Sequence, residues 1–327
     1  MSSLRLDRPE ASHRRPPPAA LTEEIANQSS RPVGPEGALF VEALQARFGS
    51  SLAGVLLYGS CLHAEDLTDG LVDLYAIVDT YGSAYPEWGL RVGNAALGPN
   101  VFYLEDSAHD PTLRAKYAVM SVGHFERGCT RWFHSYVWAR FAQPARLVYS
   151  RDTAAGARIR DALSAAVMKF LAEAAQAHDA GPFEAAELWS YGLALAYASE
   201  LRTEKNREAV LTDINRTRFE RLTACAAPGL SPVLQQTDDG RYRSGVDAGR
   251  RSRARLRWRA RRWQGRVLSI LRLTKAAFTF DRGADYLAWK IERHTGVAIP
   301  VTPTLRNHPV LFGPKFLWRL LRKGTVR

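Results

Sequence analysis

The sequence predicts an α/β (α+β) protein in which a domain with a mixed sheet precedes a mainly helical second domain. Two apolar runs, at residues 55–58 and 71–78, have the length and composition of buried strands. Two more strands are expected at residues 100–105 and 113–121, because β-branched and aromatic residues are frequent there. From residue 154 onward the chain is rich in alanine, with apolar residues at helical spacing. Strands interleaved with helices, followed by helices alone, are typical of this class.

The first part of the chain divides into a tail and a sheet domain. Residues 1–35 are rich in proline and polar residues and are predicted to be a flexible tail. An amphipathic helix is expected over residues 38–48, leading into the first strand. Another is expected across residues 87–96, between the second and third strands. The sheet domain is therefore assigned to residues 36–151.

The second part is expected to be helical. A helical domain is assigned to residues 152–249, with a break at 179–182, where glycine and proline interrupt the pattern. A basic C-terminal region, also helical, is assigned to residues 250–327. The elements expected within the helical domain are helices over residues 154–178, 183–207 and 207–226, and a loop over residues 228–249.

Length and cysteine content narrow the class of protein. The chain has 327 residues, enough for two modest domains, and no apolar run near the roughly 20 residues of a membrane-spanning helix. The first residues lack the apolar core of a secretory signal. Cys61, Cys129 and Cys225 are odd in number and scattered, which favours reduced thiols over a disulfide framework or a zinc site.

The charge predicts an acidic partner. Lysine and arginine number 45 against 33 acidic residues, a net charge of +12, and most of the basic residues are arginine. Such an excess suits nucleic acid, an anionic lipid surface or a phosphorylated substrate. Composition does not choose among these three.

One stretch carries the pattern of a nucleotidyltransferase site. Gly59-Ser60 ends the first strand, and Asp73 follows thirteen residues after Ser60, inside the second. Glycine lets the backbone approach the β- and γ-phosphates of a nucleoside triphosphate, and the serine hydroxyl and backbone N–H groups can donate to them. A carboxylate can hold Mg²⁺ beside the phosphorus under attack. The alternative is a tight turn between two core strands.

A second acidic residue is missing from the expected place. Nucleotidyltransferases usually carry two acids at positions i and i+2, which point to one face of the strand. Here Tyr75 stands at the second position. Asp69 and Asp79 lie roughly 13 and 20 Å from Asp73 along an extended strand. A second metal ligand must come from elsewhere, or one ion does most of the work.

Lys116 is a candidate for contact with the triphosphate. It is the only lysine before Lys169 in a chain that otherwise uses arginine. A compact ammonium suits a triphosphate, whereas an arginine fork suits a planar bidentate partner. The alternative is a surface lysine that extends along an edge strand.

A set of short motifs occurs in a fixed order along the chain. They are Tyr58-Gly59-Ser60, Val72-Asp73, Val78-Asp79, Asn100 to Tyr103, Lys116-Tyr117, Ala139-Arg140 with Gln143-Pro144, Tyr197 to Arg202 and, more loosely, Ser269 to Lys275. This set resembles the mitochondrial-type phosphatidate cytidylyltransferase (translocator assembly and maintenance) family of the nucleotidyltransferase superfamily. The resemblance covers roughly residues 52–295 and is strongest over 52–150. Cys61 departs from it by replacing the second glycine of the turn, and Glu200 by replacing an aspartate.

The resemblance implies an Mg²⁺-dependent reaction of CTP with phosphatidic acid that gives CDP-diacylglycerol and pyrophosphate, in phospholipid biosynthesis. Asp73 would hold the metal, and Lys116 would neutralise the triphosphate or the leaving pyrophosphate. Other candidates are Tyr58, Gly59 and Ser60 for the nucleotide and, with less support, Asp79, Glu200 and Arg202. The alternatives are a nucleotidyltransferase acting on RNA or a small alcohol, and an inactive nucleotide-binding or membrane-docking module.

The run from Arg250 to Arg266 contains nine arginines with Leu256, Trp258 and Trp263 interleaved. It could be a nucleic-acid patch, a solvated loop or a contact with an anionic membrane. The segment from Phe316 to Lys323, aromatic and cationic, favours the membrane. We therefore expect a peripheral protein at the inner face of a membrane, bacterial or mitochondrial, and no nucleic-acid partner.

Overall fold

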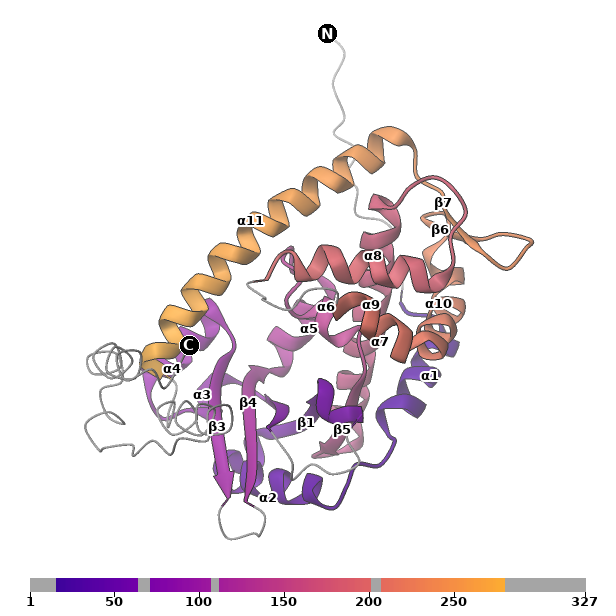
Figure 1. Ribbon diagram of the computed structural model, residues 1–327. Helices are drawn as coiled ribbons and strands as arrows, with labels where there is room; N and C mark the ends of the chain where they lie inside the picture. The colour runs from indigo at the N-terminus through magenta and orange to yellow at the C-terminus, as the bar shows by residue number, and fades with distance from the viewer. Residues whose placement is uncertain (1–15, 64–70, 107–111, 201–206, 280–327) are drawn as a thin grey trace, which may run out of the picture. The chain divides into compact units, whose positions relative to one another are not determined.

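The computed structural model describes residues 16–63, 71–106, 112–200 and 207–279 (Figure 1). These residues belong to two compact units. Unit 1 takes its residues from Met1–Pro32 and Val122–Ser269, and unit 2 from Val33–Ser121 and Ile270–Arg327. This division differs from the predicted boundary at residue 151. The division falls after Ser121, because α5 (Val122–Thr130) and α6 (Trp138–Phe141) pack against the first long helix of unit 1.

Unit 2 contains a mixed sheet, which confirms that part of the predicted fold class. Its strands lie in the order β3-β4-β2-β1. β2 pairs with β4 in parallel, whereas β1 pairs with β2 and β3 pairs with β4 in antiparallel fashion. The strands are β1 (Leu52–Tyr58), β2 (Val72–Val78), β3 (Asn100–Asp106) and β4 (Leu113–Ser121).

An aromatic core covers one face of this sheet. Phe48, at the end of α2 (Glu36–Phe48), meets Tyr117 edge-on with ring centroids 6.2 Å apart, and Tyr117 stacks on Phe102 at 5.5 Å. Asn94 of α4 (Trp88–Leu97) is fully buried and donates to the carbonyl of Val119 at 3.0 Å. A short helix, α3 (Tyr81–Ala84), precedes α4. Since side chains alternate along a strand, the residues between these core positions face the opposite side.

Unit 1 is built around α7 (Thr153–Ala177), which is buried along most of its length. Asp152 caps the helix by accepting the Ala155 N–H at 2.7 Å. Trp189 stacks on Phe219 with ring centroids 4.0 Å apart. The other elements with residues in this unit are α1 (Ala19–Ser29), β5 (Ala145–Ser150), α8 (Ala185–Tyr197), α9 (Arg207–Ile214), α10 (Arg216–Leu230), β6 (Leu234–Gln236), β7 (Tyr242–Ser244) and α11 (Ala248–Thr279), whose residues after Ser269 belong to unit 2.

Two predictions about irregular segments are wrong. The flexible tail assigned to residues 1–35 contains α1, since Leu21 and Ile25 stand one helical turn apart and are buried where α1 packs on α7 and α10. The loop assigned to residues 228–249 contains the β6–β7 hairpin, in which Gly240 supplies a turn position with φ of +80°. The helix expected after residue 183 ends at Tyr197.

Within unit 2, the end of α11 is fixed to the end of α4. The Lys275 ammonium donates to the carbonyls of Leu97 at 2.6 Å and Pro99 at 3.1 Å, and to Oδ1 of Asn100 at 2.8 Å. Arg272 donates to the Gly98 carbonyl at 2.9 Å. Cations are favoured there because the last carbonyls of a helix lack intrahelical partners.

Candidate functional site

The strand register places four polar side chains in one row across unit 2. Tyr58 of β1 lies opposite Asp73 of β2, Asp73 lies opposite Lys116 of β4, and Lys116 lies opposite Tyr103 of β3. Residues directly opposite each other in a sheet share a face. This row therefore lies on the face away from the aromatic core. Three of its members, Tyr58, Asp73 and Lys116, were expected from the sequence.

Gly59 is required beside this row for two reasons. Its φ of +91° lies in a region that other residues rarely adopt. A Cβ atom at this position would also meet Oδ2 of Asp73 at 3.2 Å. The chain then turns into the short 3-10 helix η3 (Ser60–His63). The glycine thus brings the backbone of the turn close to the carboxylate.

Asp73 and Lys116 form an ion pair, with Lys116 Nζ 2.8 Å from Asp73 Oδ1. Their side chains are 27% and 35% exposed, so both are accessible to solvent. Each group neutralises the other in this arrangement. A cation arriving at Asp73, or a phosphate arriving at Lys116, would have to compete with the existing partner.

Tyr75, at the position where a second acidic residue was expected, is a core residue. It is fully buried, and its ring meets that of Tyr58 edge-on with centroids 5.2 Å apart. Within the described residues, no group of three His, Cys, Asp or Glu side chains could hold a metal ion. Asp73 supplies one ligand for Mg²⁺. Phosphate oxygens and water would have to supply the others, as is common for Mg²⁺ bound together with a nucleotide.

Three neighbours of Lys116 were not singled out from the sequence. The Tyr103 hydroxyl donates to Glu105 Oε2 at 2.8 Å, and Arg114 Nε lies 3.7 Å from the same oxygen. Burial and the Glu105 carboxylate raise the pKa of Tyr103 well above its usual value. The alternation of β3 and β4 hints at these positions, but the pairing of the two strands is needed to bring them beside Lys116.

Cys61, which departs from the family's turn, has a structural contact. Its thiol donates to the Tyr58 carbonyl at 3.0 Å. Burial raises the pKa of the thiol to about 11, with the Asp73 carboxylate adding to the effect, so it is neutral at physiological pH. The side chain of Ser60 and the whole of Arg202 lie outside the described residues.

Asp79 lies at the other end of β2 from Asp73. The two residues are six positions apart, which is roughly 20 Å along a strand. Its backbone N–H donates to the Ser51 carbonyl at 2.9 Å, and its side chain is exposed. The structure does not bring Asp79 to the row of Asp73 and Lys116.

Glu200 belongs to unit 1, where two of the quoted motifs meet. Arg140 Nη2 lies 3.9 Å from Glu200 Oε2, and the Tyr197 hydroxyl donates to Gln143 Oε1 at 2.8 Å. The Arg140 guanidinium also lies 4.6 Å from the ring centre of Tyr136. Segments more than fifty residues apart thus form one polar cluster.

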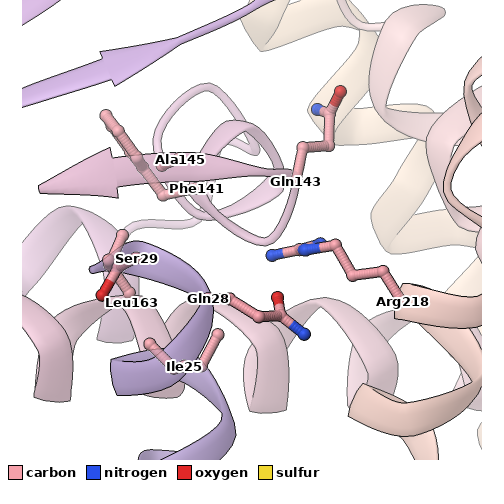
Figure 2. Close-up of a pocket in the computed structure, with 8 residues that line it drawn as sticks. All are labelled: Ile25, Gln28, Ser29, Phe141, Gln143, Ala145, Leu163 and Arg218. Carbon is pink, nitrogen blue, oxygen red and sulfur yellow. The ribbon is translucent and has the colours of Figure 1, made fainter. Parts of the chain in front are cut away.

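A small cavity of about 10 Å³ lies between α1, α10 and the segment around β5 in unit 1. Figure 2 shows the Arg218 guanidinium pointing into it, near Gln28 and Gln143. Arg218 Nη1 donates to the Ala142 carbonyl at 3.1 Å, and burial lowers the pKa of Arg218 to about 9. The cavity has room for about one water molecule and is too small for a nucleotide.

No protein-family model matches the chain, and comparison with curated proteins finds no match either. Membership of the cytidylyltransferase family therefore stays an expectation that rests on the quoted motifs.

Proposed function

We propose that this protein is an Mg²⁺-dependent cytidylyltransferase that condenses CTP with phosphatidic acid to CDP-diacylglycerol and pyrophosphate. The observation that carries the proposal is the solvent-accessible Asp73–Lys116 pair beside the positive-φ turn at Gly59. A carboxylate, a compact ammonium and a close backbone turn are the groups that handling a triphosphate requires. The motifs resembling the family supply the choice of base and acceptor.

The reaction needs little proton transfer. A phosphate oxygen of phosphatidic acid attacks the α-phosphorus of CTP, the bond from this phosphorus to the bridging oxygen breaks, and pyrophosphate leaves with that oxygen. Since the attacking phosphate is already ionised, no strong general base is required. Positioning and charge neutralisation supply most of the catalysis.

Each residue of the row has a role in this proposal. Asp73 would hold Mg²⁺, which when bound neutralises charge on the phosphates. Lys116 would leave Asp73 and neutralise the triphosphate or the leaving pyrophosphate. The absence of a side chain at Gly59 leaves room for phosphate oxygens beside the turn, where Tyr58 and Ser60 flank it.

One observation favours a second candidate. Tyr75 is buried where a second acid would stand, so the described part of the row has a single carboxylate, Asp73. A protein that binds a nucleotide or a membrane without catalysing a reaction would not need a second carboxylate. Transfer to RNA or to a small alcohol is a further alternative, because the row does not select the acceptor.

One assay separates these possibilities. The purified protein is incubated with α-³²P-labelled CTP, Mg²⁺ and phosphatidic acid, beside reactions with ATP in place of CTP and with RNA or glycerol in place of the lipid. The proposal predicts labelled CDP-diacylglycerol from CTP and phosphatidic acid alone. Label in RNA or in glycerol would show that the acceptor is not phosphatidic acid. CTP binding without any product would support the inactive module.

A further inference from the structure

The inner face of α11 is fixed to unit 1 by buried contacts. Trp258 is buried and donates from its indole nitrogen to the Glu173 carbonyl at 3.1 Å. Arg261 is buried as well, with Nη2 2.7 Å from Glu173 Oε1. Ala254 lies on the same side and is buried. These residues fix which side of the helix faces outward.

Part of the arginine run is used to hold this helix in place. Arg257 shares the Glu173 carboxylate with Arg261, at 3.1 Å. Arg255 donates to the Ala177 carbonyl at 3.0 Å and lies 2.7 Å from Asp179. The interpretation of the run as a solvated loop is wrong, because it is part of a continuous helix (Figure 1).

The outer face of α11 carries an exposed apolar stripe. Leu256 is 63% exposed and Trp263 72%, and Val267 is also exposed. At about 100° per residue these three side chains fall within an arc of roughly 40°, on the side away from Trp258 and Arg261. Leaving large apolar groups in water in this pattern is unfavourable unless a partner covers them.

Exposed arginines flank this stripe on both sides. By the same periodicity Arg259, Arg262 and Arg266 lie along one edge and Arg253 along the other, and all four are exposed. The 32 residues of α11 include no aspartate or glutamate. The outer face therefore combines an apolar centre with a positively charged rim.

We infer that the outer face of α11, defined by Leu256, Trp263, Val267 and the four flanking arginines, lies on an anionic lipid bilayer. A helix in the plane of a bilayer buries apolar side chains at the headgroup boundary and keeps its arginines among the lipid phosphates. Leu256 and Val267 offer no stacking surface to nucleic acid. Pairing of this face with the same face of a second copy is disfavoured, because the arginines of the two copies would lie against each other.

The inference deepens the proposed function, on which it rests for a lipid as the substrate. No helix of the described residues is both long and apolar enough to cross a membrane. A peripheral contact on α11 would bring the protein to the surface where phosphatidic acid resides. The contact can be measured in the absence of CTP, independently of the reaction.

The test compares matched variants of the full chain in co-sedimentation with vesicles of phosphatidylglycerol and phosphatidylcholine. Trp263→Ala should weaken binding by about tenfold, from lost apolar burial. Trp88→Ala, at a tryptophan of α4 that is 75% exposed, should leave it unchanged. The double variant Arg259→Gln, Arg266→Gln should weaken binding mainly at low salt, whereas Arg131→Gln, Arg221→Gln, with the same charge loss at exposed sites, should have a smaller effect.

Equal weakening by the Trp263 and Trp88 variants, or none by either, would overturn the inference. So would binding of the wild type to RNA but not to anionic vesicles. Turnover with water-soluble, short-chain phosphatidic acid separates this inference from the proposed reaction. Trp263→Ala should keep that turnover, so a loss of vesicle binding with turnover retained supports the contact. A wild type that binds vesicles but makes no product would contradict the reaction alone.

Discussion

Lys116 Nζ lies 2.8 Å from Asp73 Oδ1, across a parallel pair of strands whose residues are 43 positions apart in sequence. The lysine occupies the place beside the carboxylate that a metal ion would also favour. Binding of a nucleotide with its cation would exchange partners, giving the cation to Asp73 and the triphosphate to Lys116. Pairing in the absence of ligand keeps both charges compensated.

Replacing Lys116 by methionine tests this exchange. The proposed activity should fall by about 10²–10³, the effect of removing one charge-stabilising donor from a catalytic site. Affinity of Asp73 for Mn²⁺ should rise, because the competing ammonium is gone. Initial rates with labelled CTP and Mn²⁺ titration by electron paramagnetic resonance measure the two effects. Activity within about twofold of wild type would return Lys116 to the role of a surface lysine.

Gly59→Ala should impair CTP binding through the turn. The substitution puts a Cβ atom 3.2 Å from Asp73 Oδ2 and forces alanine into a positive φ, at a cost of about 1–2 kcal/mol. Gly240→Ala is the matched control, since Gly240 also has positive φ but no atom within 4 Å of the added carbon. Both variants should lose stability, measured by denaturant unfolding, but only Gly59→Ala should bind CTP more weakly in calorimetry. Wild-type affinity in Gly59→Ala would show that the turn does not approach the phosphates.

Lys169 should make the stability of the protein depend on pH. It is buried and donates to the Thr130 carbonyl at 2.9 Å. Burial lowers its pKa to about 8; Glu173 opposes this, and Arg257 and Arg261 add to it. Between about pH 8 and 10.5 the unfolded chain binds the proton that the folded protein has lost, so the free energy of unfolding should rise with pH.

The variant Lys169→Met isolates this effect, because the other groups titrate in both proteins. Across that pH range the wild type should gain stability relative to the variant, by an upper bound of about 3 kcal/mol, and below pH 8 the difference should be constant. Urea unfolding at a series of pH values provides the measurement. Parallel stability curves for the two proteins would mean that Lys169 keeps an ordinary pKa in the folded state.

The sequence was informative where the local pattern decides the structure. Short apolar runs predicted β1 and β2, and the strand ending at Tyr58 and the acid at Asp73 were placed without knowledge of the pairing. The register was not predictable, because it depends on contacts between distant segments. Tyr103 and Glu105 were therefore not identified as neighbours of Lys116, because the alternation along β3 shows only that these two side chains share a face of their own strand.

The wrong predictions also concern segments whose structure depends on contacts with distant parts of the chain. Proline and polar residues at the start of the chain masked α1, whose Leu21 and Ile25 are buried only because α7 and α10 are present. The local sequence of the run from Arg250 to Arg266 does not indicate which of its arginines face the protein and which face outward. That division comes from Glu173, more than eighty residues away, whose buried carboxylate pairs with Arg257 and Arg261.

Asp73→Asn tests the central claim most directly. The substitution preserves volume and removes the carboxylate charge, and Asp79→Asn makes the same change at the opposite end of β2. Formation of CDP-diacylglycerol from CTP, Mg²⁺ and short-chain phosphatidic acid is measured for both variants, with circular dichroism to establish folding. The account predicts that Asp73→Asn loses at least about 10²-fold in rate while Asp79→Asn stays near wild type. Wild-type turnover in a folded Asp73→Asn variant, or no product from the wild type, would contradict it.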